Sequence, residues 1–246
     1  MFALMSLDSN GKNEPFINVC DGLQAHVTLV NRTLYQDNTW NTIYLPFDMT
    51  IGEFAASPLG DADIRVFGDA TVNGTNVMMN FTPDAVNAYG GYYGGISYIV
   101  KWASGSNIVN PEFANVTITN GSYSTGGATT DGSASVYSVG TYDKMRFGVD
   151  MPTVLFVGEN NKLNYPLAGA TIGANRGYFI LDGISAAPES GIKFFTNLDD
   201  EDPTGIANIN SVEGNDDWYD LSGRKLAGKP SVKGIYVNGG RKVTVK

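Results

Sequence analysis

The chain is poor in the residues that build most catalytic and metal centres. It has one cysteine, Cys20, and one histidine, His26, in 246 residues. A single cysteine allows no intrachain disulfide, and one His with one Cys is too few for the usual zinc ligand sets. A Ser-His-Asp or Cys-His pair would have to use His26, which lies mid-strand on the polar side of an alternating pattern. We therefore expect no catalytic residue, no metal site and no cofactor.

Long apolar runs are also missing. No run approaches the roughly 20 residues that cross a bilayer as a helix, so we expect no transmembrane segment. Residues 1–8 lack a basic region, and their apolar stretch is short and broken, which is unlike a signal peptide. We expect either that a leader has been removed or that the chain is a fragment of a longer protein.

Charged residues are scarce at 17%, and acidic ones dominate. Residues 1–205 carry a formal charge of −12, whereas residues 206–246 carry +3. A body this acidic repels phosphate backbones, so nucleic acid is excluded as an expected partner. A glycan or a surface protein is the partner class that remains. The oligomeric state is not predicted.

Glycine and hydrophobic residues are abundant and predict a β fold. Glycine accounts for 30 residues, and hydrophobic residues for 42%. The alternation over 23–30 is typical of a half-buried strand, and Asn73-Gly74 between two apolar runs indicates a hairpin. We expect an all-β protein, a β-sandwich of jelly-roll or Greek-key type with a small C-terminal β appendage.

The further strands expected along the chain follow the same alternation. They cover 64–72, 75–81, 96–102, 113–119, 134–139, 153–157, 177–181 and 191–196. A short turn of helix is expected over 83–87, and the Gly/Ser/Thr-rich segment 120–133 is expected to be a mobile loop.

Composition also divides the chain. We expect an extended lead-in over 1–22, a β-sandwich domain over 23–198, an acidic linker over 199–210 and a short C-terminal β tail over 211–246. About 35 residues without a disulfide bury too little surface to fold alone. The tail is therefore expected to dock on the main domain or to pair with one of its edge strands.

The segment Trp40-Asn41-Thr42-Ile43-Tyr44-Leu45-Pro46-Phe47-Asp48 is the most informative stretch. Strand formers precede Pro46, which removes a backbone donor and stops a central strand. With segments 97–102, 139–142 and 175–179, it resembles the WNT-L-x-LPF pattern of secreted or surface-anchored Bacteroidetes proteins whose role is poorly defined. The family usually has Ala where this chain has Gly177. The resemblance implies structural strands and export to the cell surface or medium.

A second resemblance covers the tail. The order Tyr-Asp-Leu-Ser-Gly-Arg at 219–224, Lys-Gly-Ile-Tyr at 233–236 and Lys-Val-Thr-Val-Lys at 242–246 is similar to C-terminal sorting segments of the type IX secretion system. It implies a C-terminal sorting tail. The residues themselves predict three short strands with a turn at 238–240.

A glycine-framed tyrosine cluster at 89–95 is the best binding candidate. Tyr89, Tyr92 and Tyr93, together with Trp102 at the end of the next strand, are the predicted ligand-binding residues, because aromatic faces stack on the C–H face of a sugar. The alternative is that these rings pack as a loop anchor. Trp40, Tyr98, Tyr178 and Phe179 lie in strand patterns and are expected in the core.

These observations predict a non-catalytic, exported β-sandwich module with an adhesion or scaffolding role. The alternative is a carbohydrate-binding module that uses the tyrosine cluster. A glycoside hydrolase is the third and weakest hypothesis. It would need two carboxylates about 5 to 9.5 Å apart, and with 25 acids such a pair can arise by chance.

Overall fold

The computed structural model describes residues 3–158, 161–198, 218–219, 225–226, 230, 234–238 and 241–245. Strands make up 46% of the structure and helices 10%, which confirms the all-β prediction. The chain divides into two compact units, Met1–Glu201 and Asp202–Lys246. We call the first unit the body. The expected acidic linker at 199–210 lies outside the described residues.

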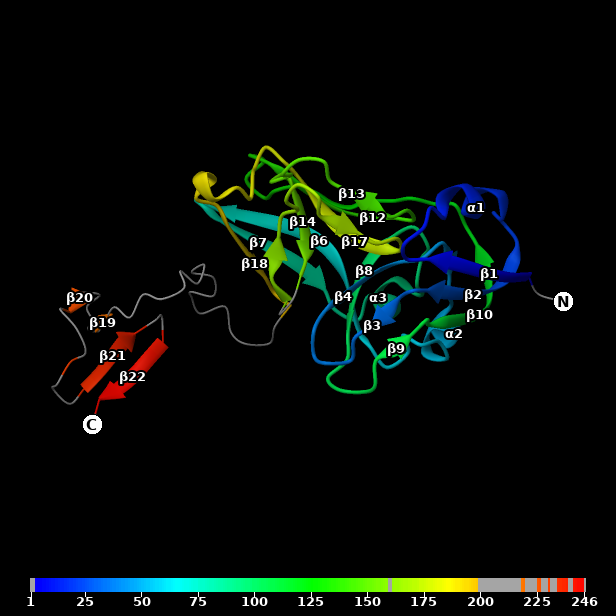
Figure 1. Ribbon diagram of the computed structural model, residues 1–246, viewed down its shortest axis with the longest axis horizontal. Helices are drawn as coiled ribbons and strands as arrows, with labels where there is room; N and C mark the ends of the chain where they lie inside the picture. Colours follow the sequence, from blue (N-terminus) through cyan, green and yellow to red (C-terminus); the bar gives the residue numbers. More distant parts are fainter. Residues whose placement is uncertain are drawn as a thin grey trace. The chain divides into compact units, whose positions relative to one another are not determined.

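The central sheet of the body contributes side chains to two hydrophobic cores. Its strands are labelled in Figure 1. All of β4 is buried, and so is β8 except for its last residue. Strands buried on both faces lose the simple in–out alternation of a two-layer sandwich. The order β18-β7-β6-β8-β4 corresponds to the bounds Lys193–Thr196, Asn76–Thr82, Asp63–Asn73, Ser97–Lys101 and Asn41–Tyr44.

A second sheet packs on one face of the central sheet. Its order β1-β2-β10-β5 corresponds to Ala3–Asp8, Gln24–Val30, Glu112–Ile118 and Phe47–Asp48. Ala25, Val27 and Leu29 of β2 face inward as predicted, but Leu23 is exposed. The lead-in expected over 1–22 is instead part of the body, because β1 pairs in parallel with β2 and helix α1 (Glu14–Val19) buries Ile17.

A third sheet covers the other face of the central sheet. Its order β11-β12-β17-β14-β15 corresponds to Thr125–Ala128, Ser135–Thr141, Arg176–Asp182, Val154–Val157 and Leu163–Asn164. The segment 120–133, expected to be a loop, therefore contains an edge strand. Gly140 and Gly177 pair across β12 and β17. A Cβ at Gly140 would overlap the ring of Tyr44, and one at Gly177 would overlap Oγ of Ser97. The two glycines thus allow close approach of the sheets.

Two sequence signals position the strands as predicted. The hairpin of β6 and β7 turns at Asn73-Gly74, where Gly74 has φ 61°. After β4, the chain passes Pro46 and enters β5, which belongs to the second sheet. The short elements that fill the corners are α2 (Ile51–Ala55), α3 (Ala85–Tyr89), η2 (Pro188–Ser190), β3 (Thr33–Leu34) with β9 (Ile108–Val109), and β13 (Met145–Arg146) with β16 (Thr171–Ile172).

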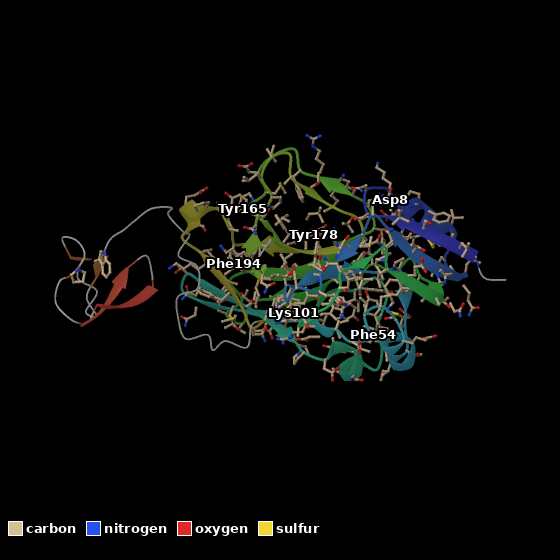
Figure 2. All side chains as sticks on the ribbon, turned by 60° about the horizontal axis from the view of Figure 1, so that its bottom comes forward. Asp8, Phe54, Lys101, Tyr165, Tyr178 and Phe194 are labelled. Atoms are coloured by element: carbon tan, nitrogen blue, oxygen red, sulfur yellow. The ribbon has the colours of Figure 1, made fainter. Side chains whose placement is uncertain are left out.

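The two cores of the body differ in their aromatic residues. Phe67, Phe81 and Phe179 form an edge-to-face trio with centroids 5.5 to 5.9 Å apart, between the central and third sheets. The other core, which we call the tyrosine core, holds two tyrosine pairs, each 4.5 Å apart. Tyr92 packs with Tyr98 on the second-sheet side, whereas Tyr44 packs with Tyr142 against Gly140 of the third sheet. Figure 2 shows the side chains that fill the layers. Trp40, Tyr98 and Phe179 are buried as predicted, and Tyr178 is half-buried.

The second unit is a small sheet with the order β20-β19-β21-β22. Its strands are Lys225–Leu226, Trp218–Tyr219, Gly234–Asn238 and Arg241–Val245. β21 and β22 pair in antiparallel fashion around residues 239–240, which lie outside the described residues.

Candidate functional site

The structure separates the four residues predicted to bind a ligand. Tyr89 and Tyr93 are 54% and 43% exposed, whereas Tyr92 is 0% and Trp102 5% exposed. The prediction is therefore wrong for Tyr92 and Trp102, which cannot stack on a ligand from inside the core. Tyr92 lies against Tyr98 and stacks at 6.4 Å on Phe54 of α2, so its ring anchors the loop.

The glycines of this loop allow backbone packing rather than uncovering the rings. A Cβ at Gly94 would lie 2.6 Å from the backbone nitrogen of Phe47, and one at Gly91 would lie 2.9 Å from the Met49 carbonyl oxygen. The Gly94 N–H donates to Oδ1 of Asp48 at 2.7 Å. The loop is therefore held against the segment 47–49, and Tyr92 is driven inward.

The exposed pair Tyr89 and Tyr93 remains available for contact. The Tyr93 hydroxyl donates to the Tyr89 carbonyl oxygen at 3.1 Å, and the Tyr93 N–H donates to the Tyr98 hydroxyl at 3.3 Å. The second contact ties the base of the exposed residue to the buried tyrosine core. The pair is a small aromatic surface on a fixed loop.

The residues considered for catalysis have ordinary structural partners. His26 lies on the outer face of the second sheet, with Nε2 3.4 Å from Oε2 of Glu112. Asp63 forms an ion pair with Arg65 at 2.8 Å. Within the described part of the chain, no group of three His, Cys, Asp or Glu side chains could hold a metal ion. The acidic residues 199–202 are outside the described residues.

Hydrogen bonds lower the pKa of several carboxyl groups. For Glu53, the backbone N–H and hydroxyl of Thr50 lower the pKa, as part of the capping box that begins α2. Hydrogen bonds in tight turns lower the pKa of Asp8, Asp37 and Asp131 in the same way. The hydrogen bonds of the capping box and of the turns therefore favour the ionised form of these carboxyl groups.

Sequence reasoning missed a basic surface on the acidic body. Two cavities of about 430 and 360 Å³ lie next to each other and share Asn10, Lys144 and Thr171. The wall of the larger cavity also includes Lys12 and Arg146, and the wall of the smaller one includes Arg176. Four basic side chains thus surround two adjoining hollows.

The basic residues come together only through the fold. Lys12 forms a β-bridge with Asp143, the neighbour of Lys144. Arg146 belongs to β13, and Arg176 begins β17. These positions span more than 160 residues of sequence, so no local motif marks them.

Comparisons with protein-family models, curated proteins and solved structures found no match. Among the described residues, no helix is long and apolar enough to cross a membrane. Two surfaces are therefore candidates on their geometry alone: the Tyr89–Tyr93 pair, whose rings can contact an apolar or sugar surface, and the basic cavities, whose cations can hold a negative group.

Proposed function

We propose that the chain is a non-catalytic module of a secreted or cell-surface protein, with a role in adhesion or scaffolding. The observation that carries this proposal is a set of exposed apolar side chains in the first 23 residues. Leu4 is 86%, Val19 80%, Leu23 52% and Phe16 47% exposed. A group of large apolar side chains exposed close together is typical of a protein interaction surface.

The elements that carry these side chains lie at one end of the body. Figure 1 shows α1 beside β1 and β2. β1 is the outer strand of its sheet, so one of its edges offers backbone donors and acceptors as well. Apolar side chains beside an open strand edge suit a contact with another polypeptide. The resemblance of the chain to exported proteins, and of its tail to sorting segments, supports a place outside the cell.

Carbohydrate binding is the second candidate, favoured by the exposed Tyr89 and Tyr93. Two rings give a smaller platform than the four aromatic residues predicted from the sequence. A glycoside hydrolase gains less support, because its acid needs a raised pKa, whereas hydrogen bonds lower the pKa of Asp8, Asp37, Glu53 and Asp131.

The test is retention of cells on mucin-coated glass under flow, a surface that offers both polypeptide and glycan. Source cells lacking the chain are complemented with wild type, Leu4→Lys or Val19→Lys. Val149→Lys is the matched control, because Val149 is 63% exposed on a different loop. A surface lysine rarely changes stability by more than about 0.5 kcal/mol. We expect several-fold weaker retention for Leu4→Lys and Val19→Lys, and wild-type retention for the control.

The same assay separates the two candidates. Retention that is lost in the Tyr89→Ala/Tyr93→Ala double variant but not in Tyr35→Ala, and that free glycans compete away, would transfer the function to carbohydrate binding. Tyr35 is a suitable control because it is 50% exposed. Equal retention with and without the chain would reject an adhesive role.

A further inference from the structure

A buried arginine without a negative partner is the feature of the body that the proposed function does not use. Arg32 is 1% exposed. Its Nη2 donates to the Thr42 carbonyl oxygen, but its Nε and Nη1 find no hydrogen-bond partner in the described part of the chain. A buried cation normally has a carboxylate beside it, since an unpaired one is strongly destabilising.

A second arginine lies close enough to act on it electrostatically. Burial and the charge of Arg176 both lower the pKa of Arg32, and burial also lowers the pKa of Arg176. The ion pairs found among the described residues are those of Arg65 with Asp63 and of His26 with Glu112. The two like charges therefore act on each other without an ion-paired carboxylate.

One of the two guanidinium groups lines a cavity, and the other is hydrogen-bonded to a residue of the cavity wall. Arg176 lines the 360 Å³ cavity, as does Thr42, whose carbonyl oxygen holds Arg32. Asn31, the neighbour of Arg32, is also on the wall. A Cβ at Gly173 would lie 2.9 Å from Nε of Arg176, so the backbone approaches this guanidinium closely.

The remaining charges around the cavity leave it positive. Lys144 lines the wall and donates to Oδ1 of Asn10 at 3.2 Å. Lys144 also acts on Asp8, whose pKa is lowered first by the Asn10 N–H, then by Asn31 and more weakly by Lys144. The Asp8 carboxylate accepts from the Asn10 N–H at 2.8 Å and from Nδ2 of Asn31 at 3.0 Å, and Figure 2 shows it at the end of β1.

We propose that this cavity binds a small oxyanion, the carboxylate, sulfate or phosphate group of a small ligand. Arg176 and Lys144 contact the anion, and Arg32 adds its charge from the interior. The planar donor fork of arginine matches the paired oxygens of such groups. The −12 charge of residues 1–205 repels long polyanions, so a compact anion fits better than a nucleic acid. This site is independent of the adhesive role.

The test measures the melting temperature of the purified chain in sodium sulfate, sodium phosphate and sodium acetate, each against sodium chloride at equal ionic strength. Ligand binding to the folded state raises the melting temperature by mass action. We expect a rise of about 5 °C in at least one oxyanion at saturation, and the ranking of the three salts identifies the preferred group. Calorimetric titration with that anion gives the stoichiometry, expected to be one.

Variants assign the effect to the cavity. Arg176→Gln should abolish the rise, and Lys144→Gln should weaken binding several-fold. Lys193→Gln removes the same charge from an exposed position on β18 and should respond like wild type. Arg32→Met should melt at or above the wild-type temperature in chloride, because it removes an unpaired buried charge, and should show a smaller rise with the anion than wild type. Equal melting temperatures in all salts, or a rise that survives Arg176→Gln, would overturn the site.

Discussion

The two cores of the body use aromatic residues in different ways. Toward the third sheet, Phe67, Phe81 and Phe179 pack with one another and with aliphatic neighbours. The tyrosine core also contains the pair Phe47 and Phe113, but its closest ring pairs are between tyrosines. The hydroxyls of Tyr44, Tyr98 and Tyr142 form hydrogen bonds. The phenylalanine core therefore depends on the shape of its rings, whereas the tyrosine core also depends on hydrogen bonds.

The hydroxyls of the tyrosine core hold surface loops in place. Tyr44 donates to Oγ of Ser122 at 2.8 Å, and Tyr142 donates to the Gly121 carbonyl oxygen at 2.8 Å. Tyr98 accepts from the N–H of Tyr93. The phenylalanine rings carry no group that could form such a link. Loops over the tyrosine core are therefore fixed from within, including the one that presents Tyr89 and Tyr93.

The largest loss in the free energy of unfolding is expected from removing one ring of the phenylalanine trio. Phe179→Ala should lower the free energy of unfolding by about 3–5 kcal/mol, because it leaves a cavity in a close-packed site. Ile180→Ala, on the opposite face of β17 and 38% exposed, should lower it by less than about 1.5 kcal/mol. Urea unfolding measures both values. Equal losses would mean that the trio is not the centre of this core.

An intermediate loss of stability should appear in alkali, and Tyr98 of the tyrosine core should contribute to it. Burial raises the pKa of Tyr98 to about 12, while its pKa in the unfolded chain is about 10. Above pH 10 the unfolded chain releases the phenol proton first, so stability is unchanged below pH 10 and falls between pH 10 and 12. The loss is on the order of 2 kcal/mol.

Unfolding midpoints in urea at several pH values between 8 and 12 would measure this fall. Tyr98→Phe should reduce the fall by the share that Tyr98 contributes, and the other buried tyrosines, whose pKa values burial also raises, account for the remainder. Tyr123→Phe should leave the fall as in wild type, because Tyr123 is 60% exposed. A fall of the same size in Tyr98→Phe would assign the alkaline sensitivity to other groups.

The smallest expected change in the free energy of unfolding distinguishes the hydroxyls of Tyr142 and Tyr92 in the same core. Tyr142→Phe leaves the Gly121 carbonyl oxygen without its donor and should lower the free energy of unfolding by about 1 kcal/mol. Tyr92→Phe should change it by less than about 0.5 kcal/mol or raise it, because the Tyr92 hydroxyl has no hydrogen-bond partner among the described residues. Chemical unfolding of both variants side by side measures the difference. A larger loss in Tyr92→Phe would mean that its hydroxyl is satisfied in solution.

Local patterns predicted the elements that local chemistry controls. The hairpin at Asn73-Gly74, the exit at Pro46 and the alternation of β2 each depend on neighbouring residues, and the structure confirms them. The third layer could not be predicted, because β4 and β8 are buried on both faces and do not alternate. β1 was missed because its parallel partner β2 follows only after helix α1. β11 was missed because its sequence, Thr-Gly-Gly-Ala, has the composition of a loop.

The candidate sites also depend on contacts that local sequence patterns do not reveal. The sequence identified the tyrosine loop, but Phe54 of α2 and Tyr98 of β8 decide that Tyr92 points inward, and neither neighbours it in sequence. Arg32 and Arg176 are 144 positions apart by their numbers, and only the fold brings them close, Arg32 from the turn after β2 and Arg176 from the start of β17. Burial and distant pairing were the missing information.

The first and last strands of the body share an unusual arrangement, since β1 lies parallel to β2 and β18 lies parallel to β7. Tension applied through the C-terminal segment along the axis of β18 would load its hydrogen bonds to β7 in shear, so that they bear the force together rather than one after another. A protein tethered through that end would resist being pulled from its anchor at this joint, and rupture would require several bonds to fail at once.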